Sequence, residues 1–160
     1  MVVLRREGTE ALTGAARPSY LVVVPHLVLD HTGDYMVEVS ARSLPELFGE
    51  AALALFETIT DVTTVRPRER VRVSVEAADP EELLVTWLTE LLFLYESERW
   101  LLCRFEPRFP DDKHVEADAW GEKLDPDRHP IDREVKAVTY HRMALVREGD
   151  LIRTRIVFDL

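Results

Sequence analysis

The tetrapeptide Asp79-Pro80-Glu81-Glu82 marks the start of a helix more clearly than any other part of this sequence. Aspartate is a preferred N-cap residue, proline suits the first helical position, and carboxylates in the first turn complement the helix dipole. The apolar residues that follow recur at three- and four-residue steps: Leu83, Leu84, Trp87, Leu88, Leu91, Leu92 and Tyr95. The pattern predicts an amphipathic helix whose apolar face lies in the core.

A second helix is predicted to start at Ser43. The segment Ser43-Leu44-Pro45-Glu46 has the form of a capping box, in which the hydroxyl and the carboxylate each satisfy a free backbone amide. Its apolar face is again regular: Leu44, Leu47, Phe48, Ala51, Ala52, Leu55 and Ile59. We therefore expect two core-packed helices in this chain.

Stretches with strand-like alternation or composition lie before, between and after the two helices. They cover residues 26–29, 35–41, 71–75, 100–105, 115–120, 135–145 and 151–158. Two helices among several strands predict an α+β fold, a two-layer α/β sandwich with the helices packed on a mostly antiparallel sheet. The length of 160 residues suits one domain, which we place at residues 21–160 after a loose N-terminal extension at residues 1–20.

The formal charge of −10 bears on the partners of the chain. Affinity for nucleic acid depends largely on Lys and Arg side chains that neutralise phosphates, so we expect no stable direct nucleic-acid binding. An acidic surface instead favours cations, or a protein whose own face is basic.

Several functional classes lack their usual signals. Cys103 is the single cysteine, which rules out an internal disulfide and a Cys-rich zinc site and fits the cytoplasm. No apolar run approaches the roughly 20 residues of a membrane helix. A Gly-rich phosphate loop, a Gly-x-Ser-x-Gly elbow and a His-Glu-x-x-His helix are also missing, so we expect a protein that is not an enzyme.

Two places in the sequence are candidates for metal binding. His31 and Asp34 lie in a predicted turn after a strand, where side chains are exposed and held by the sheet. Asp159 places a carboxylate beside the terminal carboxylate of Leu160, and hard cations prefer oxygen ligands. Asp34 could complete this acidic group if the last strand runs beside the first turn. An Asx turn at Asp34 and a solvated terminus at Leu160 are the plainer alternatives.

A third candidate region contains Glu122 and the strand-like stretch from Glu134 to His141. Alternation there places polar groups on both faces. A single lysine such as Lys136 is usually a solvated edge charge, and a single histidine is usually structural, which makes catalysis the minority interpretation.

Taken in order, these segments resemble the archease family from residue 26 to residue 160. The matching blocks are His31-Thr32-Gly33-Asp34, Ser43-Leu44-Pro45-Glu46-Leu47-Phe48, Glu82 to Leu88, Gly121-Glu122, His129-Pro130, Glu134 to His141 and Phe158-Asp159-Leu160. The sequence departs from the family pattern at Gly33, at Tyr35-Met36 and at Leu160, but every proposed oxygen ligand is present.

The resemblance implies a divalent metal ion, with calcium as first choice and magnesium or manganese as alternatives, held by Asp34, Asp159 and the terminal Leu160. It also implies an RtcB-type RNA ligase as the partner, whose guanylylation and multiple turnover the protein would promote in tRNA splicing. His31, Glu122 and Lys136 are candidates for contacting the partner or supporting the site.

Two other functions stay open at this point. One is modulation of another RNA-modifying enzyme, such as a tRNA methyltransferase. The other is a metal-dependent hydrolase that uses Asp34 and His31 and would turn over without a protein partner.

Overall fold

The computed structural model describes residues 26–31, 34–139 and 143–160, with the side chains of residues 26–31 and 34 outside that description. The expected extension at residues 1–20 also lies outside the described residues. The elements follow in the order β1 (His26–His31), β2 (Asp34–Ala41), α1 (Leu44–Ile59), the short helix η1 (Val62–Thr64), β3 (Glu69–Glu76), α2 (Pro80–Glu98), β4 (Trp100–Asp111), β5 (His114–Lys123), β6 (Ala137–Thr139), β7 (Val146–Glu148) and β8 (Leu151–Asp159).

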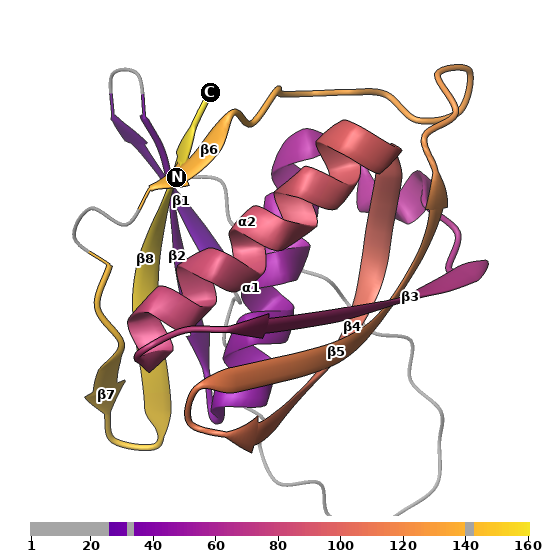
Figure 1. The fold of residues 1–160 in the computed structure, drawn as a ribbon. Coiled ribbons are helices and arrows are strands. Elements are labelled where there is room, and N and C mark those ends of the chain that lie inside the picture. The colour runs from indigo at the N-terminus through magenta and orange to yellow at the C-terminus, as the bar shows by residue number, and fades with distance from the viewer. Residues whose placement is uncertain (1–25, 32–33, 140–142) are drawn as a thin grey trace, which may run out of the picture.

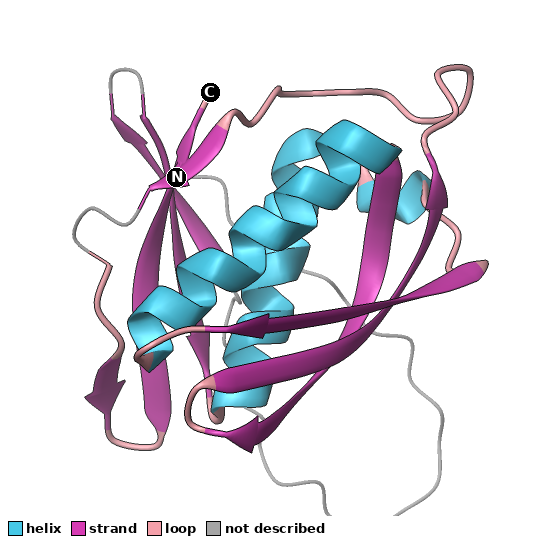
Figure 2. Ribbon diagram, viewed as in Figure 1, coloured by secondary structure: helices cyan, strands magenta, loops and turns pink. Residues whose placement is uncertain are grey.

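The described strands form two antiparallel sheets, one on either side of the helices (Figure 1). In one, the order is β1-β2-β8-β6, with β7 also paired to β8; in the other, the order is β3-β5-β4. Figure 2 shows the two long helices between them. The α+β class and the antiparallel pairing are confirmed, but the strands divide into two sheets where a single sheet was expected.

Both helices start where their capping sequences predict. Ser43 Oγ accepts a hydrogen bond from the Glu46 amide at 3.3 Å, and Asp79 Oδ1 accepts one from the Glu82 amide at 2.8 Å. Each glutamate then reaches back one residue beyond its cap: Glu46 Oε2 accepts from the Arg42 amide at 3.0 Å, and Glu82 Oε2 from the Ala78 amide at 2.9 Å. Both helix starts thus satisfy backbone amides that would otherwise be unpaired.

The core lies around the contact between the two helices. Trp87 on α2 is fully buried, and its indole N–H donates to the Phe48 carbonyl on α1 at 3.1 Å. The ring of Phe105 on β4 packs edge-on against Trp87 at 6.4 Å between centroids and stacks against Phe56 at 5.8 Å. These aromatic contacts join α1, α2 and the β3-β5-β4 sheet into one core.

The strands after α2 differ from their predicted extents. β4 and β5 are longer than expected and join in a tight turn. In the stretch predicted over residues 135–145, the described residues form a strand at Ala137–Thr139. Residues 140–142 lie outside the described residues. Strand β7 was not predicted, because all three of its residues are exposed and no alternation marks it.

Gly121 on β5 lies at the closest approach of β5 and β4. An added methyl group would overlap the carbonyl oxygen of Leu101, so glycine is required for this pairing. No helix in the described ranges is long and apolar enough to cross a membrane.

Candidate functional site

The end of β8 brings together three strands from distant parts of the sequence. Asp159 lies directly opposite Asp34 of β2 on one side and opposite Ala137 of β6 on the other. Positions paired directly across an antiparallel ladder lie on one face of the sheet. Figure 1 shows this end of β8 beside β6, where the chain terminates. Two of the three predicted metal-binding positions are therefore neighbours in the backbone.

Lys136 holds the last residue of β8, Asp159, and the residue after it, Leu160, beside β6. Its backbone amide donates to the Asp159 carbonyl at 2.8 Å, and its ammonium donates to the Leu160 carbonyl oxygen at 2.9 Å. Just before them, Phe158 is fully buried and stacks on Tyr35, with ring centroids 6.5 Å apart. This end of β8 is hydrogen-bonded to the segment before β6, while Asp159 itself is exposed to solvent.

The donor chemistry of these positions fits a hard cation. The two aspartates and the terminal carboxylate of Leu160 would offer oxygen ligands, which calcium and magnesium prefer. Among residues with described side chains, no group of three or more His, Cys, Asp or Glu could hold a metal, and the side chain of Asp34 lies outside that set. His31 is paired with Asp34 in the β1–β2 ladder, and its side chain also lies outside the description.

A shallow hollow of about 250 Å³ adjoins Lys136 between α2 and β6. Phe93 of α2 lines it and is 55% exposed, the highest exposure of any large apolar side chain described. The other lining residues are Thr89, Leu92, Glu96, Ala137 and Val138. The region around Lys136 therefore combines an apolar contact surface with the polar end of β8.

Glu122, the other charged candidate, lies elsewhere and is buried. It is 6% exposed, near the end of β5, which Figure 1 places across the helices from the end of β8. Arg128 donates to both of its oxygens, at 2.6 and 3.1 Å, and the Arg66 amide donates to Oε1 at 2.8 Å. The hydrogen bonds from Arg128, followed by those from Arg66 and His129, outweigh burial and lower the pKa of Glu122 from 4.5 to about 2.

His129 also belongs to this buried cluster, and its hydrogen bonds define which ring nitrogen carries the proton. Its Nδ1 accepts a hydrogen bond from the Asp125 amide at 2.9 Å, so the proton is on Nε2, which lies 3.1 Å from Glu122 Oε1. At 2% exposure, His129 is a structural residue that fastens the loop after β5. The partners of Glu122 were missed at the sequence level, although an Arg-His pair six residues after a strand-end glutamate was a usable signal.

Fold and site together define a small α+β protein with an acidic, hydrogen-bonded sheet end. The model of the archease protein family matches residues 27–160. By sequence, the chain is 41% identical to the protein archease of Methanopyrus kandleri over 140 residues, covering 86% of this chain and all of that one. The Sulfurisphaera tokodaii protein archease is 38% identical over 133 residues, covering 82% and 95%.

Solved structures agree with these sequence matches. The solution structure of Methanobacterium thermoautotrophicum protein 1598 has a TM-score of 0.74 at 36% identity and covers 85% of this chain and 99% of that chain. The crystal structure of a Thermotoga maritima archease, described as a possible chaperone, has a TM-score of 0.56 at 25% identity and covers 82% and 94%. The chain belongs to the archease family.

Proposed function

We propose that this chain is a metal-binding accessory protein, without catalytic activity of its own, that activates an RtcB-type RNA ligase in tRNA splicing. It promotes guanylylation of the ligase and its repeated turnover. The observation that carries this proposal is the pairing of Asp34 with Asp159 at the end of a sheet where Lys136 holds Leu160. Membership of the archease family supports an accessory role.

Asp34, Asp159 and Leu160 are the residues we propose to hold a divalent ion, calcium first, with magnesium or manganese as alternatives. A bound ion would supply a positive charge that orients anionic oxygens of the partner or its nucleotide. Lys136 positions one Leu160 oxygen through its hydrogen bond. Its ammonium also reduces the repulsion among the acidic groups gathered at this end of the sheet.

The partner we propose is a ligase with a basic RNA-binding cleft. A chain of net charge −10 complements such a cleft, and complementary charge speeds encounter between proteins. The exposed Phe93 beside Lys136 offers an apolar contact at the same end of the molecule. We place the interaction in the cytoplasm, with the chain leaving the cleft before RNA enters, and His31 as a further contact residue.

The test is to mix the purified chain with its cognate ligase, guanosine triphosphate and a divalent ion. We expect more guanylylated ligase and more joined tRNA halves per ligase than without the chain. If neither quantity rises, the proposal is wrong. Turnover of a substrate by the chain alone would instead support a hydrolase, and capture of a methyltransferase without the ligase would support the other alternative.

A further inference from the structure

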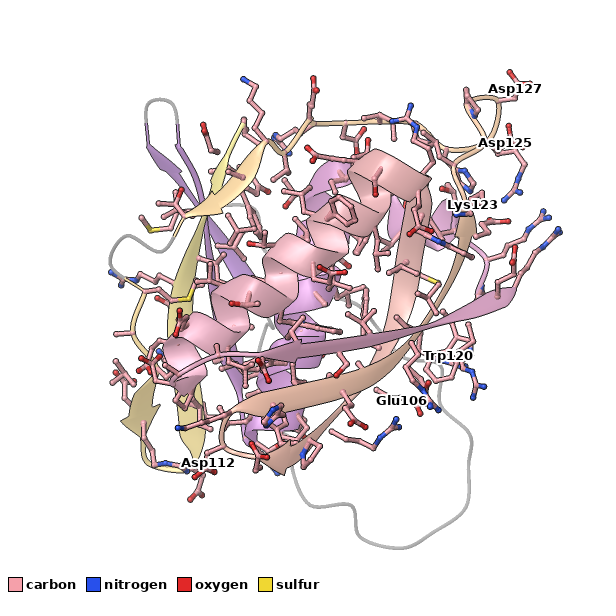
Figure 3. All side chains as sticks on the ribbon, viewed as in Figure 1. Glu106, Asp112, Trp120, Lys123, Asp125 and Asp127 are labelled. Atoms are coloured by element: carbon pink, nitrogen blue, oxygen red, sulfur yellow. The ribbon has the colours of Figure 1, made fainter. Side chains whose placement is uncertain are left out.

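The outer face of the β3-β5-β4 sheet carries arginines on both of its edge strands. Arg70 on β3 and Arg104 on β4 lie opposite the same residue of β5, Trp120, and the rows beside them place Arg72 opposite Asp118 and Arg108 opposite Glu116. All four arginines are exposed. Figure 3 shows Trp120 and the neighbouring Glu106 projecting from this sheet away from the helices.

Three of these guanidinium groups converge on one carboxylate. Asp118 is 7% exposed, and its Oδ2 lies 3.3 Å from both Nη atoms of Arg108. Arg72 Nε and Arg70 Nε lie 3.6 and 3.9 Å from Oδ1. Although burial acts to raise it, the pKa of Asp118 is lowered by these arginines. Three guanidinium groups therefore surround one carboxylate at this point.

Each of Arg70 and Arg72 retains its terminal N–H donors. A guanidinium has five N–H groups, four of them on the Nη atoms. Within the described residues those Nη atoms make no hydrogen bond, and the side chains of Arg70 and Arg72 are 59% and 68% exposed. The planar fork of Arg matches phosphate oxygens in a bidentate geometry.

Arg104 lies flat against an aromatic ring in the middle of this face. Its guanidinium carbon is 3.8 Å from the centroid of the Trp120 ring. Stacked aromatic and guanidinium planes on an open sheet are the surfaces on which proteins stack unpaired bases. The Arg104–Trp120 pair therefore offers a surface for stacking a base, in addition to the phosphate-binding guanidinium groups.

The remaining charges on this face and its few exposed apolar side chains favour a nucleic acid over a protein as its partner. Glu106 and Glu116 lie among the arginines, so four arginines stand against three carboxylates around Asp118 and Trp120. Glu76 and Glu122 lie further along the same face and are paired with His114 and Arg128. The exposed large apolar side chains in the described part are on other elements: Phe93, Ile131 and Val146. Stable protein interfaces have an apolar core, which this face lacks.

We propose that this face, defined by Arg70, Arg72, Arg104, Arg108 and Trp120, binds a single strand of nucleic acid. The guanidinium groups contact successive phosphates, and one base stacks on the Arg104–Trp120 pair. The net charge of the chain keeps the complex weak and salt-sensitive, with a Kd in the range of about 10⁻⁶ to 10⁻⁴ M. This agrees with the absence of stable nucleic-acid binding expected from composition, and it does not rest on the proposed ligase activation.

The test measures the fluorescence anisotropy of a labelled, unstructured RNA oligonucleotide of about 20 nucleotides titrated with the full chain at about 50 and about 200 mM salt. We expect saturable binding at the lower salt and at least about tenfold weaker binding at the higher. Replacing Arg70 and Arg72 with Ala should weaken binding by about fivefold or more. Arg104→Ala should weaken it by a similar factor through loss of stacking. A DNA oligonucleotide should bind comparably, because neither contact reads the sugar.

The matched control is Arg153→Ala with Arg155→Ala on β8. This variant makes the same change in charge, but Arg153 is paired with Glu148 at 3.3 Å and Arg155 with Glu38 at 3.1 Å. Its affinity for the oligonucleotide should stay within about twofold of that of the unaltered chain, because those charges are already neutralised. Glu106→Gln with Glu116→Gln should strengthen binding, a gain that cannot be mistaken for misfolding.

Three results would overturn the proposal. The first is no change in anisotropy up to about 100 μM chain at low salt, the weak end of non-specific affinities. The second is equal loss of affinity in the β8 control. The third is binding of a labelled poly-glutamate peptide but not of either oligonucleotide, which would assign the face to an acidic protein. The variant with Arg70→Ala and Arg72→Ala should activate the ligase as well as the unaltered chain does. The proposals of nucleic-acid binding and of ligase activation can therefore be refuted independently.

Discussion

Asp34 and Asp159 lie directly opposite each other in the β2–β8 ladder, although 125 residues (159 − 34) separate them in the sequence. Their pairing places the two proposed carboxylate ligands at the same end of one sheet. Lys136 donates to the oxygen of the following residue, Leu160. The site is thus formed by tertiary structure, and each of its members can be tested separately.

Asp159→Asn should weaken calcium binding on the order of tenfold or more, because the amide keeps the shape of the ligand but loses its charge. Isothermal titration calorimetry measures this directly, and ligase guanylylation should fall in parallel. Asp150→Asn is the control, since Asp150 makes the same change at an exposed turn before the other end of β8. Equal affinities in the two variants would contradict the ligand role of Asp159.

A tag fused after Leu160 should lower both divalent-ion affinity and ligase activation. The fusion replaces an anionic oxygen pair by a neutral amide and crowds the place where Lys136 holds the Leu160 oxygen. The same tag placed before Met1 should leave both properties intact. If the two tagged proteins bind calcium and activate the ligase equally, Leu160 does not contribute a ligand.

Lys136→Ala should reduce ligase activation while changing Tm by no more than a few degrees, because exposed polar contacts contribute about 1 kcal/mol or less. Lys136 is exposed and its ammonium bonds only the end of β8 among the described residues. Lys113→Ala, an exposed lysine in the β4–β5 turn, is the control. A large drop in Tm would show that Lys136 acts on folding instead.

Glu122→Gln should lower the free energy of unfolding on the order of 3 kcal/mol at neutral pH, because it breaks a buried ion cluster with Arg128. The pKa of Glu122 in the folded chain, about 2, lies below its ordinary value of 4.5. Ionised Glu122 therefore stabilises the fold fully above about pH 4.5, and this contribution is lost as the pH falls toward 2.

Denaturant unfolding at several pH values measures this effect. The stability difference between Glu122→Gln and the unaltered chain should shrink as the pH falls, while Glu116→Gln, an exposed change on the same strand, stays within about 0.5 kcal/mol throughout. Retained stability combined with lost ligase activation would restore the partner-binding role first expected for Glu122.

Gly121→Ala should destabilise the chain by about 2 kcal/mol or more, because the new methyl group overlaps the Leu101 carbonyl and forces β4 and β5 apart. Gly49→Ala provides the contrast within α1. The methyl group there has ordinary contacts, the nearest at 3.8 Å to Pro107. Alanine at that position should stabilise the helix by about 0.5 to 1 kcal/mol. Thermal unfolding should show a lower Tm for Gly121→Ala and a higher Tm for Gly49→Ala than for the unaltered chain.

The sequence predicted the parts of this fold that depend on local physical chemistry. Ser43 and Asp79 cap their helices because the hydroxyl and the carboxylate accept hydrogen bonds from amides three residues later. The division of the strands into two sheets was not predicted, because alternation defines a face but not which strands are neighbours. Strand β7 was missed since its residues are exposed on both faces.

The sequence singled out the residues of the proposed site but not their surroundings. Asp159 was identified because it lies beside the end of the chain. Its proximity to Asp34 depended on β8 pairing with β2, which the sequence alone does not show. Glu122 was expected to contact the partner or support the site, and the Arg-His pair six residues later, a signal of its burial, was not used. Arg128 and His129, in the loop after β5, bury Glu122. That loop has no helical or strand periodicity from which its path could be predicted.

Strand β8 pairs with β2, β6 and β7, so three other strands of its sheet depend on it. It starts 110 residues (151 − 41) after β2 ends, which means that β1 and β2 leave the ribosome long before their sheet can be completed. A two-stranded hairpin is marginal by itself in water. Pairing over such a distance is also slow, because the loop must close before the contacts form. The acidic end of the sheet therefore exists only after folding is complete, and a half-made chain lacks the strand pairing on which the proposed calcium site depends.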